Sequence, residues 1–339
     1  MTIAPAPTST SETVSQPWIK TPLIYSAILS KLAGCKIYLK LENVQPSGSF
    51  KSRGVGNLVR QAILRAPPNT PLHFYCSSGG NAGLACVTAA VTLGHASSVI
   101  VPLSCKPMMI DKLRAAGATD VIQIGQTWFE ADKHLREVVL ANDPNGVYVP
   151  PFDHPDVWKG ASSMIEEIDE QLEGDGKMDA IVCSVGGGGL LIGLCDGLAN
   201  RPEDKKNKTQ VVTVETLGAE SLYQSVQAKS HITLPGITSL ANSLGCVRVA
   251  SRAFEYALQP HVHSTVVSDR EAVEACIRFA DDERILVEPA CGATIALVYT
   301  GKLKEVLKYD EGDRVVLVVC GGSNISLEML QGYKETFNL

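Results

Sequence analysis

Short apolar segments alternate with helical patterns from residue 36 almost to the C-terminus, and no other feature of the sequence constrains the fold as much. The apolar segments are rich in Val and Ile without polar alternation, which is typical of strands buried on both faces. The predicted strands are 36–41, 73–76, 98–101, 121–124, 180–185, 211–215 and 314–320. The predicted helices are 81–93, 107–116, 128–140, 190–199 and 271–279. This pattern predicts an α/β protein in which helices cover a parallel sheet.

Two domains are expected, because 339 residues exceed the usual length of one domain, about 100 to 200 residues. Turn-forming residues gather at 142–146 and Pro150-Pro151 follows, which indicates a crossing between the domains. Residues 1–16 are rich in Ser, Thr, Pro and Ala and predict a mobile tail.

Composition argues against several classes of function. The longest apolar stretch, 180–194, is split by four consecutive glycines and is shorter than the roughly 20 residues of a membrane span. The net charge is −6, and the one lysine-rich run, 205–208, is expected to be a solvated loop, so nucleic acid is not expected as a partner. The N-terminus has neither a signal peptide nor an arginine-rich transit pattern, which favours a cytoplasmic location. The ten cysteines are scattered and most are interpreted as reduced core residues.

Four segments with glycines follow predicted strands or border predicted helices, where ligands gather in open α/β sheets. In the first, residues 47–54, Lys51 begins a predicted helix and is either a surface charge or a lysine that traps a carbonyl group. In the second, residues 77–83, backbone N–H groups at a helix start suit a carboxylate. A helix capped by Ser78 or Asn81 is the alternative there, but it does not explain two glycines.

The third segment is a run of four glycines between a buried strand and an apolar helix, Gly186, Gly187, Gly188 and Gly189. Successive N–H donors at a helix start form a nest for a phosphate monoester, whereas a flexible linker is the alternative. The fourth segment, residues 318–324, ends a buried strand with Cys320-Gly321-Gly322. Cys320 is a core residue by default, but its place at the carboxyl end of a strand favours a functional role.

Together these motifs resemble the fold type II (β-family) pyridoxal phosphate (PLP) enzymes, and within them the serine/threonine dehydratases, from about residue 22 to 330. The closest likeness is to the short animal-type L-serine dehydratases, because Ala82-Gly83 follows Asn81 where threonine deaminases and serine racemases usually have His. The chain also ends soon after Cys320, which leaves no room for a regulatory domain.

The resemblance implies an architecture similar to the tryptophan synthase β subunit, with two open parallel-sheet domains and helices on both faces. The large PLP-binding domain would comprise 17–43 and 150–339, and the small domain, 44–149, would close over the substrate. A homodimer that binds small amino acids, serine and threonine, is implied as well.

The resemblance also assigns the site. Lys51 would bind PLP covalently, Phe50 would lie beside its ring, Asn81 would reach its 3-hydroxyl, Cys320 would face its pyridine nitrogen and the four glycines would hold its phosphate. The substrate carboxylate would contact Ser78, Gly79, Gly80 and Asn81. The residues implied as catalytic are Lys51, Ser78 and Ser243. A monovalent cation, potassium, would be bound by Glu215 and by the carbonyls of Ala219, Leu244 and Cys246; the alternative is that Glu215 caps a helix or pairs with a base.

Two residues depart from the family pattern. Gly79 stands where many close relatives have Ala, which is expected to loosen the grip on substrate. Ser243 stands where the liver-type enzymes have Ala, and its hydroxyl is placed to relay a proton on the far face of the cofactor. The expected reaction is deamination of L-serine to pyruvate and ammonia, with slower action on L-threonine to give 2-oxobutanoate. A threonine deaminase, a serine racemase or a non-catalytic binding protein remain alternatives.

Overall fold

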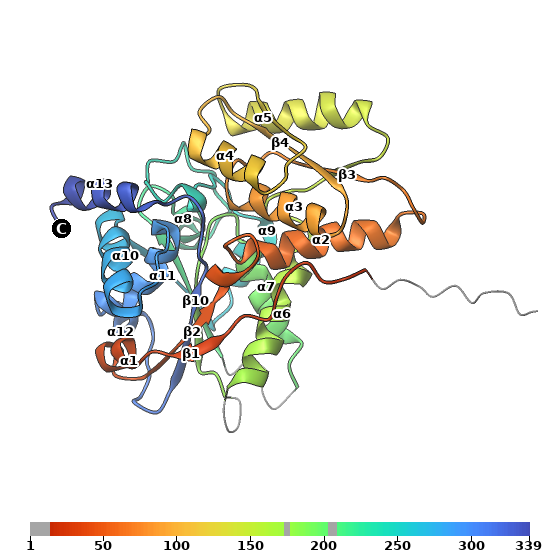
Figure 1. Cartoon of the computed structure of the whole chain (residues 1–339). Coiled ribbons are helices and arrows are strands. Elements are labelled where there is room, and N and C mark those ends of the chain that lie inside the picture. The colour runs from red at the N-terminus through yellow and green to blue at the C-terminus, as the bar shows by residue number, and fades with distance from the viewer. Residues whose placement is uncertain (1–13, 173–176, 203–208) are drawn as a thin grey trace, which may run out of the picture.

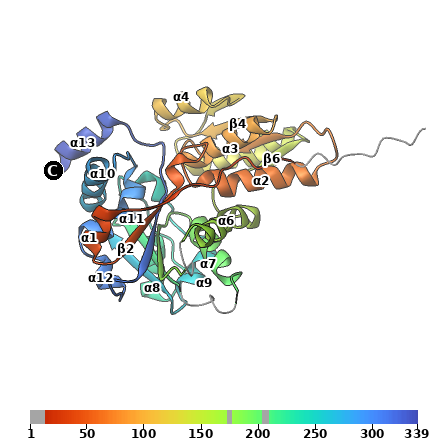
Figure 2. The ribbon, with the colours of Figure 1, turned by 60° about the horizontal axis from the view of Figure 1, so that its bottom comes forward.

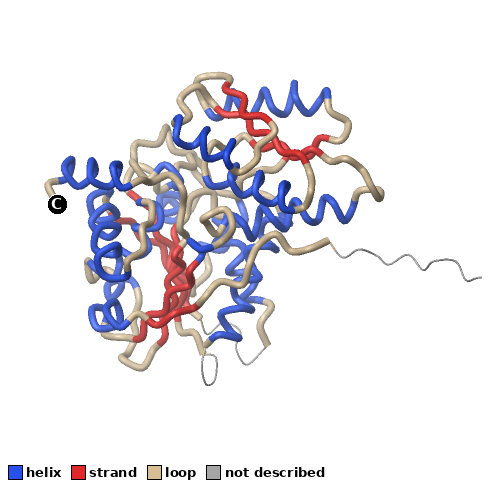
Figure 3. Tube along the Cα trace, viewed as in Figure 1, coloured by secondary structure: helices blue, strands red, loops and turns tan. Residues whose placement is uncertain are grey.

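The computed structural model describes residues 14–172, 177–202 and 209–339. Most of the predicted tail 1–16 and the lysine-rich run 205–208 lie outside the described residues. Two parallel sheets form the framework, and Figure 3 shows their strands as two separate groups surrounded by helices.

The larger sheet has six strands in the order β1-β2-β10-β7-β8-β9 (Figure 1). Every pairing is parallel except that of β1 with β2. Its strands are β1 (Leu23–Tyr25), β2 (Lys36–Leu41), β7 (Ala180–Ser184), β8 (Gln210–Thr216), β9 (Val262–Val267) and β10 (Arg314–Val319). Its helices are α1 (Ala27–Ala33), α6 (Pro155–Gln171), α7 (Gly189–Ala199), α8 (Ser221–Ala228), α9 (Ser251–Ala257), α10 (Asp269–Glu283), α11 (Pro289–Tyr299), α12 (Leu303–Val306) and α13 (Leu327–Phe337), with short 3-10 turns at η1 (Glu42–Val44) and η4 (Asn242–Leu244).

The smaller sheet has four parallel strands in the order β5-β4-β3-β6. Its strands are β3 (His73–Cys76), β4 (Ala96–Val101), β5 (Asp120–Gln123) and β6 (Gly146–Tyr148), and its helices are α2 (Lys51–Arg65), α3 (Asn81–Thr92), α4 (Pro107–Ala115) and α5 (Trp128–His134), which continues through a π-turn at Leu135–Val139 and a 3-10 turn at Leu140–Asn142. Figure 2 shows this unit as a separate layer above the larger sheet, with α2 and α6 at the boundary.

The expected α/β fold with parallel sheets and helices on both faces is confirmed. All seven predicted strands are present with ends shifted by two residues or fewer, whereas β1, β6 and β9 were missed. All three are edge strands of their sheets. An edge strand has a neighbouring strand on one side only, so fewer of its residues are buried. The four central residues of β9 are partly exposed, and its sequence therefore contains no continuous apolar run that would predict a strand.

Each unit has its own apolar core, and the larger core surrounds β2, β7, β8 and β10. Eight of the ten cysteines are buried, which confirms that most are core residues. Among the described residues, the longest helices are too short or too polar to cross a membrane.

A buried network of four charges joins α2 to the larger unit. Arg53, in the first turn of α2, pairs with Glu42 of η1 and with Glu167 of α6, and Lys40 of β2 also pairs with Glu167. The side chains of Arg53, Glu42 and Lys40 are fully buried, and the two positive charges balance the two negative ones. Because buried charges are tolerated only with such partners, the network fixes the start of α2, where Lys51 lies.

Candidate functional site

Lys51 is the first residue of α2 and is held against the end of β10. The N–H of Phe50 donates to the carbonyl of Cys320 at 3.1 Å, and the N–H of Gly322 donates to the carbonyl of Gly48 at 2.9 Å. The Lys51 amine donates to the carbonyl of Pro151 at 2.5 Å. Burial of the amine lowers the pKa of Lys51 to about 8, because the charged form is poorly solvated there. A substantial fraction of an amine with this pKa is neutral, and therefore nucleophilic, near neutral pH.

A hollow beside Lys51 is shared with the glycine run. Phe50, Lys51 and Gly54 line one side of it, and Gly189 and Leu190 at the start of α7 line another. The Lys51 nitrogen lies 5.3 Å from the centre of the Phe50 ring. The proposed covalent lysine and part of the proposed phosphate cup therefore face the same space.

The four glycines that lead from β7 into the first residue of α7 are closely surrounded. A Cβ atom on Gly187 would lie 2.2 Å from the ring of Phe152, and one on Gly189 would lie 2.6 Å from the Phe152 carbonyl. Gly188 has φ of +88°, in the left-handed region, and a Cβ there would lie 2.4 Å from that of Ala253. Gly186 would place its Cβ 2.9 Å from the Ser243 carbonyl. The run thus forms a cradle that only backbone can line, and the first N–H groups of α7 have no helical partners.

The segment 151–155 supports this cradle. Its Pro151 carbonyl accepts the hydrogen bond from Lys51, and the Phe152 carbonyl accepts one from the Trp158 indole at 2.9 Å. The Phe152 ring packs on the glycine run.

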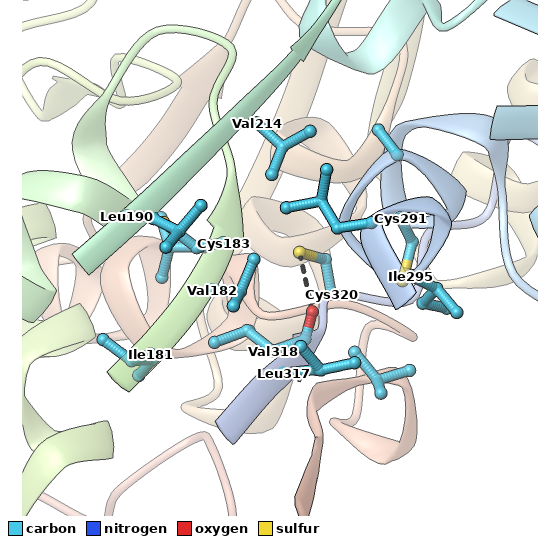
Figure 4. Packing of buried hydrophobic residues seen from close by; sticks show 14 of the residues in the cluster. Ile181, Val182, Cys183, Leu190, Val214, Cys291, Ile295, Leu317, Val318 and Cys320 are labelled. Carbon is cyan, nitrogen blue, oxygen red and sulfur yellow. Dashed lines mark hydrogen bonds between the residues drawn. The ribbon is translucent and has the colours of Figure 1, made fainter. Parts of the chain in front are cut away.

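Cys320 follows β10 and is buried in the larger core. Figure 4 shows its sulfur among apolar side chains, with a contact of 3.5 Å to the Val318 carbonyl. The Ser184 hydroxyl lies 3.4 Å from the sulfur. A hydrogen bond from Cys291, helped by Ser184 and opposed by burial, lowers the pKa of Cys320, while burial raises the pKa of Cys291 well above its ordinary value. Cys320 lies close enough to Lys51 to influence the pKa of that amine.

The loop from Ser78 to Asn81 leads into α3. Gly80 is the N-cap of α3 and no side chain caps it, so the alternative that Ser78 or Asn81 caps this helix is wrong. The Ser78 hydroxyl instead accepts the N–H of Gly80 at 3.2 Å. The side-chain amide oxygen of Asn81 accepts the N–H of Ser323 at 2.8 Å, which joins the smaller unit to the loop after β10.

Glu288 completes this site and was missed from the sequence. It immediately precedes α11, is 4% exposed, and accepts hydrogen bonds from the Asn81 amide at 3.0 Å and the Asn324 N–H at 3.1 Å. Burial raises the pKa of Glu288, and hydrogen bonds from Ser243, Asn324 and Asn81 oppose that shift. Gly322, with φ of +112°, leaves room for it, because a Cβ there would lie 2.0 Å from the Glu288 carboxyl carbon. The sequence did contain one sign of a functional role for Glu288: it is a single acidic residue directly before Pro289 in an otherwise apolar stretch.

Ser243, in η4, lies beside these residues. Its hydroxyl accepts hydrogen bonds from the amides of Asn81 at 3.3 Å and Asn324 at 3.0 Å. The structure therefore places Ser243 beside the start of α3, next to the Glu288 carboxyl.

Glu215 ends β8 and is fully buried. Its two oxygens accept the N–H groups of Leu222 at 2.9 Å and Tyr223 at 2.7 Å in the first turn of α8. Burial raises the pKa of Glu215 to about 8, with the two hydrogen bonds opposing the shift. In the structure Glu215 therefore caps the start of α8, as the helix-capping alternative stated.

Two of the residues whose carbonyls are predicted to share a cation with Glu215, Leu244 and Ala219, take part in local backbone hydrogen bonds. The Leu244 carbonyl accepts the Cys246 N–H at 2.7 Å, and Ala219 donates its own N–H to Thr216 at 2.9 Å. Within the described ranges, no group of three or more His, Cys, Asp or Glu side chains is placed to hold a metal.

A lysine amine of lowered pKa beside an aromatic ring, a glycine cradle at a helix start and a thiol at the end of the central strand define a site for a phosphate-bearing aldehyde cofactor. The chain belongs to the family of pyridoxal-phosphate dependent enzymes, whose sequence profile matches residues 14–321.

Individual relatives narrow this class. The chain is 44% identical over 330 residues to the L-serine dehydratase/L-threonine deaminase of Bos taurus, which covers 95% of this chain and 96% of that protein. It is 40% identical over 333 residues to an L-serine dehydratase of Saccharomyces cerevisiae, covering 94% and 98%. The fungal L-serine ammonia-lyase of Rhizomucor miehei superposes with a TM-score of 0.87 at 35% identity, over 95% of this chain and 100% of that one.

Proposed function

We propose that the protein deaminates L-serine by β-elimination to pyruvate and ammonia, and acts more slowly on L-threonine to give 2-oxobutanoate. The observation that carries the proposal is the meeting of the Lys51 amine, the glycine cradle and Cys320 from separate elements at one place. The relatives named L-serine dehydratase match this chain over almost their whole lengths.

The residues present fit PLP. The four glycines carry no Cβ atoms, so their N–H groups are open to a phosphate, and the neutral Lys51 amine is available for a covalent bond. Bound PLP supplies an electron-withdrawing ring that stabilises negative charge on the α-carbon of an amino acid. Phe50 would flank the ring, Asn81 would donate to its 3-hydroxyl, and Gly186 to Gly189 would hold the phosphate.

Lys51 would remove the α-proton of bound serine. Its pKa of about 8 keeps part of the amine neutral, and the Pro151 carbonyl orients it. A positioned base of this kind typically contributes about 100-fold to 10,000-fold. The hydroxyl on the β-carbon then leaves as water, and hydrolysis of the remaining enamine gives pyruvate and ammonia.

The loop from Ser78 to Asn81 would hold the serine carboxylate through backbone N–H groups at the start of α3. Cys320 would face the pyridine nitrogen without supplying a carboxylate, so that nitrogen would not be held protonated by charge pairing. This arrangement favours elimination over transamination.

The alternatives within the fold are less well supported. Threonine deaminase from Solanum lycopersicum and serine racemase from Dictyostelium discoideum superpose with TM-scores of 0.81 and 0.76, but at 25% and 26% identity. The contact of the Ser243 hydroxyl with the Glu288 carboxyl is the one observation that favours a slow racemase activity, since it offers a proton relay.

The remaining expectations stay part of the proposal. The large domain would comprise 17–43 and 150–339, and the small domain, 44–149, would close over the substrate. The protein would act as a cytoplasmic homodimer. Potassium bound near Glu215, Ala219, Leu244 and Cys246 would order the loop beside the phosphate cradle.

The test is pyruvate release from serine by the holoenzyme, with the absorbance of bound PLP recorded in the same sample. One methyl group is worth about 1 to 3 kcal/mol, so kcat/KM for serine should exceed that for threonine by about 10-fold to 200-fold. A preference for threonine would favour the deaminase alternative, and bound PLP without turnover of either amino acid would favour a binding protein. Formation of D-serine, measured by chiral chromatography, would reveal the racemase.

A further inference from the structure

Gly79 lies in the loop proposed to hold the substrate carboxylate, and a Cβ there would meet a cysteine side chain at close range. Its φ lies outside the left-handed region, so its backbone does not require glycine. A Cβ built at Gly79 would lie 2.4 Å from the sulfur of Cys105 and 3.1 Å from a methyl of Val101. All of the closest atoms belong to side chains, and the closest one is the thiol.

Cys105 comes from a different element. It lies between β4 and α4, where its N–H donates to the Pro102 carbonyl at 3.0 Å. Its side chain is half-buried against the cluster that includes Val101, Met109 and Leu113. Burial raises the pKa of the Cys105 thiol, so the group that packs on Gly79 is neutral.

We propose that Cys105 is a positioning residue for the substrate loop, whose thiol fills the space that a side-chain methyl at position 79 would otherwise occupy. The thiol supports the loop from outside, and the conformation of Ser78 to Asn81 then depends on the pair Gly79–Cys105 and not on either residue alone. This inference rests on the proposed role of that loop in binding serine.

The geometry predicts rescue. With Cys105→Ala, the sulfur is gone and the loop loses its support, so the KM for serine should rise about 5-fold, as for a methyl-sized cavity. With Gly79→Ala alone, the new methyl overlaps the sulfur, and KM should rise by a similar factor. The double variant should return to within about 2-fold of the unmodified protein. The Cβ at 79 would then lie 3.6 Å from that of residue 105, an ordinary van der Waals separation, and the Val101 methyl at 3.1 Å would need to move by only a few tenths of an ångström.

The control is Cys35→Ala, a buried cysteine of the larger core. Combined with Gly79→Ala, it should give the product of the two single effects, with no rescue. Purely additive effects of Gly79→Ala and Cys105→Ala on KM, in protein that retains its PLP absorbance, would overturn the proposal.

A second readout does not depend on turnover. Iodoacetamide alkylates a thiol by forming a sulfur–carbon bond with loss of iodide, and the thiol proton passes to the buffer. Gly79→Ala should turn the Cys105 sulfur outward and raise its alkylation rate, measured by peptide mass spectrometry in the holoenzyme, by about 5-fold relative to Cys246, the other partly exposed cysteine.

An unchanged Cys105 rate would show that the thiol does not pack on position 79 and would overturn the proposal. If serine is not deaminated at all, the proposed function fails, and the alkylation rates still decide whether Cys105 packs on position 79.

Discussion

Two glycine-rich turns connect a strand to a helix in this protein, and they need glycine for different reasons. In the turn 186–189, added Cβ atoms would meet backbone atoms, the Phe152 ring or the Cβ of Ala253, and Gly188 is left-handed. In the turn 77–83, only Gly83 would meet backbone, at 1.9 Å from the Ser78 carbonyl, whereas Gly79 and Gly80 would meet the Cys105 thiol and the Asn324 amide.

The difference separates a fixed site from an adjustable one. Atoms fixed in the larger core shape the proposed phosphate cradle, so it tolerates no added atom. Side chains of neighbouring elements surround the proposed carboxylate loop. Single substitutions of these side chains should therefore change how tightly the loop binds substrate. Substitutions in the first turn should therefore affect cofactor affinity, and those in the second should affect substrate affinity.

The largest effect is expected at Lys51, the proposed base and the proposed point of attachment of PLP. Lys51→Ala should lower pyruvate formation from serine by at least about 100-fold to 10,000-fold, because the positioned base is lost. Lys159→Ala, on the exposed face of α6, is the matched control and should leave the rate unchanged. Borohydride reduction followed by tryptic mapping should place the cofactor on Lys51; attachment to another lysine would make the assignment wrong.

Gly188→Ala tests the fixed turn. The left-handed φ costs about 1 to 2 kcal/mol for a residue with a side chain, and the overlap with Ala253 costs about 1 to 3 kcal/mol more. If the strain falls on the cofactor-binding conformation, the PLP dissociation constant, measured by fluorescence titration of the apoprotein, should rise about 30-fold to several thousand-fold. Unchanged PLP affinity in a folded variant would count against the cradle.

Glu288→Gln tests the link between the turn 77–83 and the loop after β10. The carboxylate accepts from both Asn81 and Asn324, whereas an amide would set an NH₂ group against one of these donors. An unpaired buried donor costs about 1 to 3 kcal/mol, so kcat/KM for serine should fall about 5-fold to 150-fold. Wild-type kinetics would show that the contacts are not needed for catalysis.

The pH dependence of PLP uptake reports on the Lys51 amine. Only the neutral amine attacks an aldehyde. Because the pKa of Lys51 is lowered to about 8, the fraction of neutral amine grows about tenfold per pH unit below pH 8. The rate at which the apoprotein combines with PLP should therefore rise between pH 6 and 8 and level off above it. A rate that still climbs through pH 10, where an ordinary lysine titrates, would exclude the burial effect.

The sequence predicted the parts of this site that depend on one chain segment. The glycine run and Cys320 each stand beside a strongly apolar strand or helix, so local pattern pointed to them, whereas Lys51 was singled out by the resemblance to PLP enzymes. Glu288 was missed because its role depends on partners far along the chain, Asn81 at one side and Asn324 at the other. The contact of Cys105 with Gly79 is likewise tertiary, since residues 26 positions apart meet only when β3 and β4 pair.

The smallest effect is expected from Gly80→Ala, the same change as Gly188→Ala but in the adjustable turn. Gly80 has φ of −112°, outside the left-handed region, and its new Cβ would lie 3.1 Å from the Asn324 amide nitrogen and 3.8 Å from the Ser78 hydroxyl. A side-chain amide can move by a few tenths of an ångström, so the strain should stay below about 1 kcal/mol, which corresponds to less than about 5-fold in the KM for serine. The PLP dissociation constant should not change. If Gly80→Ala weakened PLP as strongly as Gly188→Ala, both turns would bind the cofactor and the division between a fixed cradle and an adjustable substrate loop would be wrong.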